Sequence, residues 1–173
     1  MGLENYGSYL RHDSRDDKYL REEHLPLLAV IDFKLIPDTN MIEIGNGNEP
    51  WDACINGSDI YEIVQSLPAK EFEVRRAIAS GGQSSAMYFQ HADDHLQFPR
   101  VIIDMIAKKQ SKKYSDNRSL VIVFVGDYSG EDDDVIERWI HEVRSETTRG
   151  DFKEILLVEL DRMRVFTLFP PDK

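Results

Sequence analysis

The chain has 173 residues, of which 41% are hydrophobic, and a formal net charge of −11. This length fits one domain with one sizeable core, and no run of about eighteen apolar residues is present to span a bilayer. The polar segment 1–17 lacks the apolar stretch of a signal peptide, and the single cysteine, Cys54, excludes an intramolecular disulfide. We therefore expect a cytoplasmic protein with no membrane partner. Its acidity opposes nucleic-acid binding except through a local basic patch.

The N-terminal third predicts an arm, a helix and three strands. Residues 1–17 carry many charges without an apolar period, which predicts a flexible arm ahead of one α/β domain at 18–173. Apolar residues at near-helical spacing predict a helix over 18–35, interrupted near Pro26. Short strands are predicted at 41–44, 51–55 and 59–64. The last two flank Asn56-Gly57-Ser58, a connection typical of a β-hairpin.

The remainder predicts helices that alternate with strands. Pro68 opens an amphipathic helix at 69–79, and a second helix is predicted at 98–109, where Phe98, Ile102, Met105 and Lys109 share a face. The apolar run 120–125 does not alternate, which is typical of a strand buried on both faces. A helix at 131–143 and strands at 154–160 and 163–169 follow. The order predicts a three-layer α/β fold, a mixed sheet flanked by helices.

Two carboxylates on the predicted hairpin are the main candidates for chemistry. Asp52 and Glu62 lie on adjacent strands, so they can converge and offer hard oxygen ligands to Mg²⁺ or Mn²⁺. Such an ion polarises a phosphodiester and activates water. Glu43 on the preceding strand is a possible third carboxylate. In the alternative interpretation these acids are ordinary polar residues on a half-exposed hairpin, paired with Arg75 or Arg76.

Three segments carry a family resemblance. Residues 50–55 (PWDACI) resemble a Pro-Asp strand with one inserted residue, and residues 59–65 (DIYEIVQ) resemble a Glu-x-Lys strand after a turn. Residues 98–114, followed by the strand at 120–125, resemble a helix that ends in lysines and tyrosine. Together they are similar to the PD-(D/E)XK nuclease superfamily. The resemblance implies a restriction-endonuclease-like fold and metal-dependent hydrolysis of DNA phosphodiesters, with Asp52 and Glu62 as magnesium ligands.

The catalytic lysine of that superfamily is missing from its expected place. Residues two apart on a strand share a face, so the lysine position after Glu62 is held by Val64, which cannot orient water or bind phosphate. Gln65 can serve if a bulge shifts the strand, and Lys70, Arg75 or Arg76 on the next helix can supply the charge. We include Gln65 and Lys70 as candidate catalytic residues.

A basic patch follows the helix predicted at 98–109. Its members can track a phosphate backbone and leave Tyr114 to stack on a base. In the alternative interpretation they complement the negative C-terminal end of the helix. The patch consists of Lys108, Lys109, Lys112, Lys113 and Arg118.

Two functions remain open from the sequence. One is a metal-dependent nuclease or nuclease-like protein that acts on DNA. The other is a non-catalytic protein-interaction module on the same scaffold, because a missing lysine and an acidic surface are typical of a fold that has lost its chemistry. Unpaired strand edges allow a homodimer in either case.

Overall fold

The computed structural model describes residues 23–37, 41–45, 48–66, 94–112, 114, 117–124 and 131–172. Their strands form one six-stranded sheet in the order β1-β2-β3-β4-β5-β6. The strands are β1 (Ile42–Ile44), β2 (Ala53–Ile55), β3 (Asp59–Gln65), β4 (Ser119–Phe124), β5 (Ile155–Glu159) and β6 (Arg164–Phe169). Three helices of ordinary length accompany them in the described part: α3 (Leu25–Phe33), α5 (Asp94–Gln110) and α6 (Asp133–Glu146).

The sheet is mixed, as the sequence predicts. β1, β2 and β3 form an antiparallel meander, β4 and β5 run parallel to β3, and β6 returns antiparallel to β5. Asn56 and Gly57, at the turn between β2 and β3, have φ angles of 53° and 70°. Two left-handed residues in succession suit the right-handed twist of a two-stranded hairpin. The predicted hairpin is therefore confirmed.

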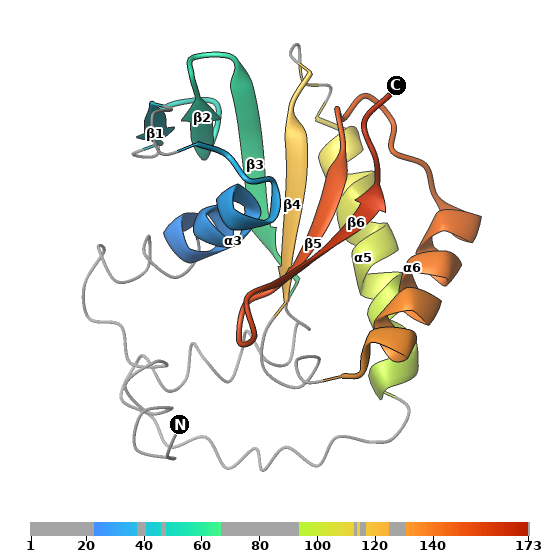
Figure 1. The fold of residues 1–173 in the computed structure, drawn as a ribbon. Coiled ribbons are helices and arrows are strands. Elements are labelled where there is room, and N and C mark those ends of the chain that lie inside the picture. The colour runs from blue at the N-terminus through green and yellow to red at the C-terminus, as the bar shows by residue number, and fades with distance from the viewer. Residues whose placement is uncertain are drawn as a thin grey trace, which may run out of the picture.

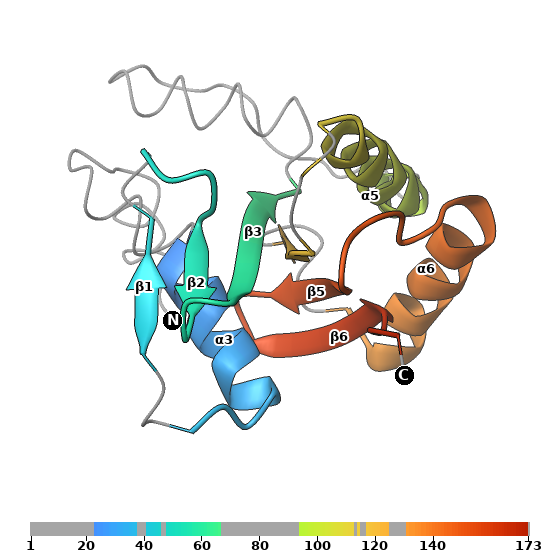
Figure 2. The same ribbon diagram turned by 90° about the horizontal axis from the view of Figure 1, so that it is seen from above.

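Helices cover both faces of the sheet, so the α/β, three-layer prediction is confirmed in outline (Figures 1 and 2). α3 packs on one face, where Leu27 and Val30 meet Tyr61, Ile63 and residues of the central strands. α5 and α6 pack on the other face around a second core that includes Phe98, Trp139 and Ile140. Every residue of β4 is buried, as its unbroken apolar run predicts.

Several boundaries differ from the predicted ones. α5 begins at Asp94 rather than at Phe98, with Pro99 inside the helix. A proline there removes one helical hydrogen bond, but Phe98 and Ile102 are fully buried and hold this turn against the sheet. β2 begins at Ala53, so Asp52 precedes the strand instead of lying in it. The arm predicted at 1–17 and the helix predicted at 69–79 lie outside the described residues.

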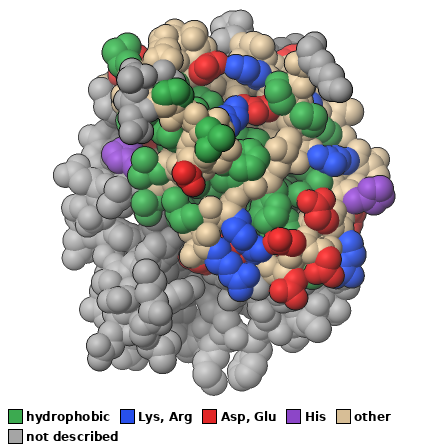
Figure 3. Space-filling model, in the orientation of Figure 1, with side chains coloured by type: hydrophobic (Ala, Val, Ile, Leu, Met, Phe, Trp, Pro, Cys, Tyr) green, Lys and Arg blue, Asp and Glu red, His purple; other side chains and the backbone are tan. Residues whose placement is uncertain are grey.

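The surface on the α3 side carries exposed apolar side chains. Figure 3 shows hydrophobic side chains gathered near the middle of this face. Among the described residues, no helix is long and apolar enough to cross a membrane. The large hydrophobic residues that are most exposed are Leu28, Phe33, Leu35, Met41, Ile42 and Met163.

Candidate functional site

Asp52 and Glu62 are neighbours across the hairpin. Ala53 is paired with Tyr61 in the register of β2 and β3, so the next step along the two chains sets Asp52 opposite Glu62. The backbone continues the ladder, because the N–H of Asp52 donates to the carbonyl oxygen of Tyr61 at 3.1 Å. The structure thus brings together the two acids that the sequence singled out, although one of them lies just before its strand.

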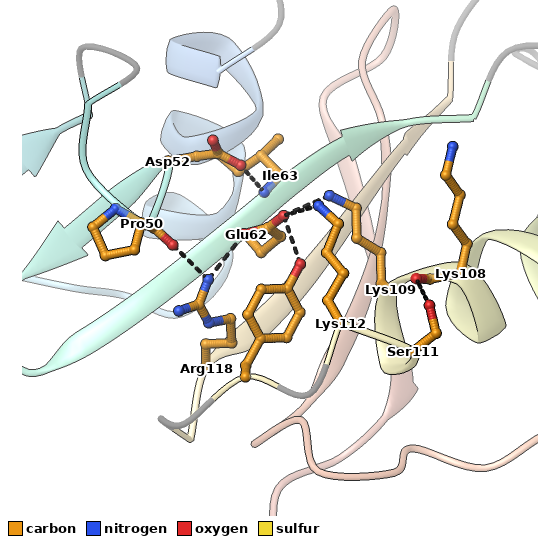
Figure 4. Close-up of polar contacts among 10 residues, drawn as sticks. Pro50, Asp52, Glu62, Ile63, Lys108, Lys109, Ser111, Lys112 and Arg118 are labelled. Carbon is orange, nitrogen blue, oxygen red and sulfur yellow. Dashed lines mark hydrogen bonds and ion pairs between the residues drawn. The ribbon is translucent and has the colours of Figure 1, made fainter.

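The carboxylate of Asp52 accepts a backbone hydrogen bond from β3 at a position that β2, which begins at Ala53, does not reach. Its Oδ2 accepts a hydrogen bond of 2.6 Å from the N–H of Ile63, which lies beyond the last ladder bond to β2 (Figure 4). Burial raises the pKa of Asp52, the Ile63 hydrogen bond lowers it, and the negative charge of Glu62 raises it again. The balance holds the pKa above the usual value of an aspartate, so this carboxyl accepts a proton more readily than an exposed one.

Glu62 lies inside a cluster of positive and hydroxyl donors. Its Oε1 accepts hydrogen bonds from the ammonium of Lys109 and, at 2.9 Å, from the hydroxyl of Tyr114. Its Oε2 accepts a hydrogen bond of 3.0 Å from Arg118, and the Nζ of Lys112 lies 3.9 Å from Oε1. Figure 4 shows Lys109 of α5, Lys112 of the turn after it and Arg118, just before β4, converging on the carboxylate. We call this group the Glu62 cluster.

The cluster keeps Glu62 ionised despite its burial. Only 8% of the residue is exposed, and this burial by itself raises the pKa of the carboxyl. The hydrogen bond and charge of Lys109, followed by the Tyr114 hydroxyl and the charge of Lys112, more than offset that effect and lower the pKa below its usual value. Burial and the bond to Glu62 raise the pKa of Tyr114, so its hydroxyl stays a donor.

Arg118 and Tyr114 do not belong to a surface patch as predicted. Arg118 is only 2% exposed, and its Nη1 donates both to Glu62 and, at 2.7 Å, to the carbonyl oxygen of Pro50. Its guanidinium lies over the Tyr114 ring at 4.0 Å from the centroid. That ring also packs against Phe152 at 5.8 Å. The ring and the hydroxyl of Tyr114 therefore already have partners within the protein, which opposes the predicted stacking of this ring on a nucleic-acid base.

A groove of about 380 Å³ opens beside the Glu62 cluster, between the end of β3 and α5. Gln65, a predicted catalytic residue, lines this groove, as do Lys108, Lys109 and Lys112 of the predicted basic patch. Val64, which takes the place of the superfamily's lysine, also lines it and packs partly against the core. Lys70 and Lys113, the other predicted site residues, lie outside the described part of the chain.

The donor set fits a divalent ion only in part. Within the described residues, no group of three acidic, histidine or cysteine side chains is placed to hold a metal, so Glu43 does not complete a triad. Asp52 and Glu62 provide two carboxylates, but both oxygens of Glu62 already accept hydrogen bonds. An ion bound here would share the Glu62 carboxylate with these donors or take the place of one of them.

Lys109 is the partner of Glu62 that the sequence reasoning missed. It was counted in a solvent-facing patch, yet its side chain is only 15% exposed and bonds to Glu62. The signal was its position on the same helical face as Phe98, Ile102 and Met105. A lysine on a helix face that packs on a sheet needs a buried acceptor, and in the structure Glu62 is that acceptor.

The site thus joins a hairpin acid pair to cations from a distant helix. Four polar side chains surround one carboxylate, and a lysine-lined groove adjoins them. Comparisons of the chain with models of protein families, with curated proteins and with solved structures find no match.

Proposed function

We propose that the chain is a metal-dependent nuclease, or a nuclease-like protein, that acts on DNA phosphodiesters. The observation that supports this most directly is that Asp52 and Glu62 lie opposite each other with the ammonium of Lys109 on Glu62. Two adjacent carboxylates and one lysine are the polar groups that the resemblance to the PD-(D/E)XK superfamily implies. The lysine comes from α5 instead of from the strand position of Val64.

The order of elements supports the same proposal. α3 precedes three antiparallel strands, α5 follows them, and β4 then joins the sheet parallel to β3. The helix predicted directly after the hairpin, at 69–79, lies outside the described residues, so this comparison covers the other elements. The lysine that the resemblance implies at Val64 is absent from the strand, and this departure weakens the resemblance at that segment.

Each residue has a role that its position allows. Asp52 and Glu62 would hold a Mg²⁺ or Mn²⁺ ion, which would supply Lewis-acid activation of a phosphate and of water. Lys109, beside Glu62, would neutralise negative charge that develops on the phosphate. Gln65 lines the adjoining groove, where it would orient the DNA strand.

One observation favours the second function, a non-catalytic interaction module. Glu62 has both oxygens occupied, and Arg118 is buried against it, so the cluster is complete without any metal. Asp52 likewise has a structural task in pairing the N–H of Ile63. On this interpretation the acids and cations stabilise the hairpin, and the partner binds elsewhere.

Thermal melting with millimolar Mn²⁺ separates the two functions. For a nuclease, the ion raises the melting temperature of the wild type by about 2–4 °C for each kcal/mol of binding. Asp52→Asn and Glu62→Gln abolish the rise, whereas Asp134→Asn, which changes an exposed acid on α6, retains it. Cleavage of DNA by the wild type but not by the two site variants completes the test. An identical melting temperature with and without Mn²⁺ in the wild type contradicts the nuclease.

A further inference from the structure

The groove beside the Glu62 cluster has an apolar floor and a cationic rim. Val64 of β3 and Val101 and Met105 of α5 line it, and all three are only partly buried. Lys108 and Lys109, in the last turn of α5, and Lys112, just after the helix, also line it. A site of this kind accepts a ligand that is flat and apolar on one side and anionic on the other.

The lysines of the rim are only partly neutralised by the carboxylates of the groove and of the Glu62 cluster. In the described part of the chain Lys108 makes no ion pair, and its side chain is exposed. Lys112 is 50% exposed and reaches Glu62 only at 3.9 Å. Asp104, the acid that lines the groove, is engaged by Arg100 at 3.5 Å. In a chain of net charge −11, this local excess of cations favours an anionic ligand.

Gln65 adds an unused hydrogen-bond donor. Its Nε2 is buried and donates to no acceptor within the described residues, and its side chain lines the groove. A buried donor without an acceptor destabilises the fold. An oxygen or ring nitrogen of a ligand in the groove is the kind of acceptor that this donor lacks.

We propose that the groove binds one unstacked nucleotide of single-stranded DNA. Its phosphate lies at Lys108 and Lys112, its base lies on Val64, Val101 and Met105, and Gln65 donates to the base edge. This inference rests on the proposed function and narrows its substrate from DNA in general to a single strand. A duplex buries the faces of its bases in the stack, whereas a groove of about 380 Å³ matches a ligand of nucleotide size.

Binding in the absence of metal tests the groove separately from catalysis. A fluorescent twelve-residue oligothymidylate is titrated with the full-length protein in EDTA, and a duplex of the same length is the comparison. The expected result is tighter binding of the single strand. Lys108→Glu weakens it tenfold or more at low salt, and Lys108→Ala lowers the salt dependence by about one ion. Arg138→Glu is the matched control, because Arg138 is an exposed cation on α6 outside the groove.

Two further variants test the floor and the amide. Met105→Gln keeps the volume but makes the floor polar, and it weakens oligothymidylate binding severalfold without changing the salt dependence. Gln65→Leu removes the donor and also weakens binding, while it leaves the melting temperature unchanged or higher. Equal affinity for single strand and duplex, or equal loss in Lys108→Glu and Arg138→Glu, overturns the proposal. Competition by thymidine monophosphate as effective as that by the oligonucleotide also overturns it, in favour of a free nucleotide.

The same experiments separate failure of the groove proposal from failure of the nuclease proposal. If the wild type and Asp52→Asn both bind the single strand in EDTA and neither responds to Mn²⁺, the groove is upheld and catalysis is not. If Mn²⁺ stabilises the wild type but Lys108→Glu binds and cleaves single-stranded DNA as the wild type does, the metal site is upheld and the groove is not.

Discussion

Two of the buried glutamates, Glu154 and Glu62, lie on opposite faces of the sheet and have very different numbers of side-chain donors. On the α3 face, Glu154 is 3% exposed and is bonded by the ammonium of Lys34 and, at 2.8 Å, by the hydroxyl of Ser119. On the α5 face, Glu62 has Lys109, Arg118 and Tyr114, with Lys112 nearby. One cation and one hydroxyl are sufficient to keep a carboxylate buried. Glu62 therefore has more positive charge around it than Glu154 has, and the groove that we propose for an anionic ligand adjoins this charge.

The largest effect on stability is expected at Glu154, which has fewer donors than Glu62. Lys34→Ala leaves the buried Glu154 carboxylate with the Ser119 hydroxyl as its remaining donor among the described residues, and we expect a loss of about 3 kcal/mol in the free energy of unfolding. Urea denaturation measures the loss. The double variant Lys34→Met with Glu154→Gln removes both charges and is expected to recover most of it. A loss below about 1 kcal/mol in Lys34→Ala would mean that the Glu154 pair is no more than a surface ion pair.

An intermediate effect is expected from Glu62→Gln. The variant keeps the shape but leaves the cations of the Glu62 cluster unopposed, and it is expected to cost about 2 kcal/mol. Inorganic phosphate is then expected to restore the melting temperature more than sodium chloride of equal ionic strength, because the anion takes the place of the carboxylate. The matched control is Glu154→Gln, which has a single cation and gains nothing specific. Equal recovery of both variants would remove the distinction between the two faces.

The smallest effect is expected in the pH dependence, where Asp52 and Glu62 act in opposite directions. The pKa of Asp52 is raised by burial, so its contribution to stability is present below about pH 3.9 and is lost as the pH rises through its folded-state pKa. The pKa of Glu62 is lowered despite burial, through Lys109, so its contribution is present above about pH 4.3 and is lost as the pH falls through its folded-state pKa.

Denaturation of three proteins between pH 3 and 7 measures these contributions. Relative to Asp52→Asn, the wild type loses stability as the pH rises, and relative to Glu62→Gln it loses stability as the pH falls. Parallel curves for the wild type and both variants would contradict the pKa shifts of both groups.

Most strands and helices of the described residues were predictable because each has a local sequence pattern typical of its type. The run at 119–124 is apolar at nearly every position and is buried throughout, and the turn at Asn56 and Gly57 fixes the hairpin. The start of α5 was not predictable in this way. Pro99 is typical of a helix start, but the burial of Phe98 outweighs the one lost hydrogen bond, and this burial depends on how α5 meets the sheet.

The candidate site was only half predictable. The hairpin register places Asp52 and Glu62 together, because it depends on residues less than a dozen apart. The cations that surround Glu62 come from α5 and from the segment before β4, about fifty residues along the chain. Their direction is set by tertiary packing, which is why Arg118 and Tyr114 were assigned to the surface. Lys109 on an inward helix face was the one local signal of the cluster.

Arg118 also joins two parts of the site mechanically. The same nitrogen bonds Glu62 and the carbonyl oxygen of Pro50, in the turn that leads to Asp52. A ligand that draws Glu62 away from Arg118 therefore loosens the turn at 48–52 as well. Amide hydrogen exchange in that turn is then expected to report ligand binding at Glu62, even for a ligand that never touches Asp52.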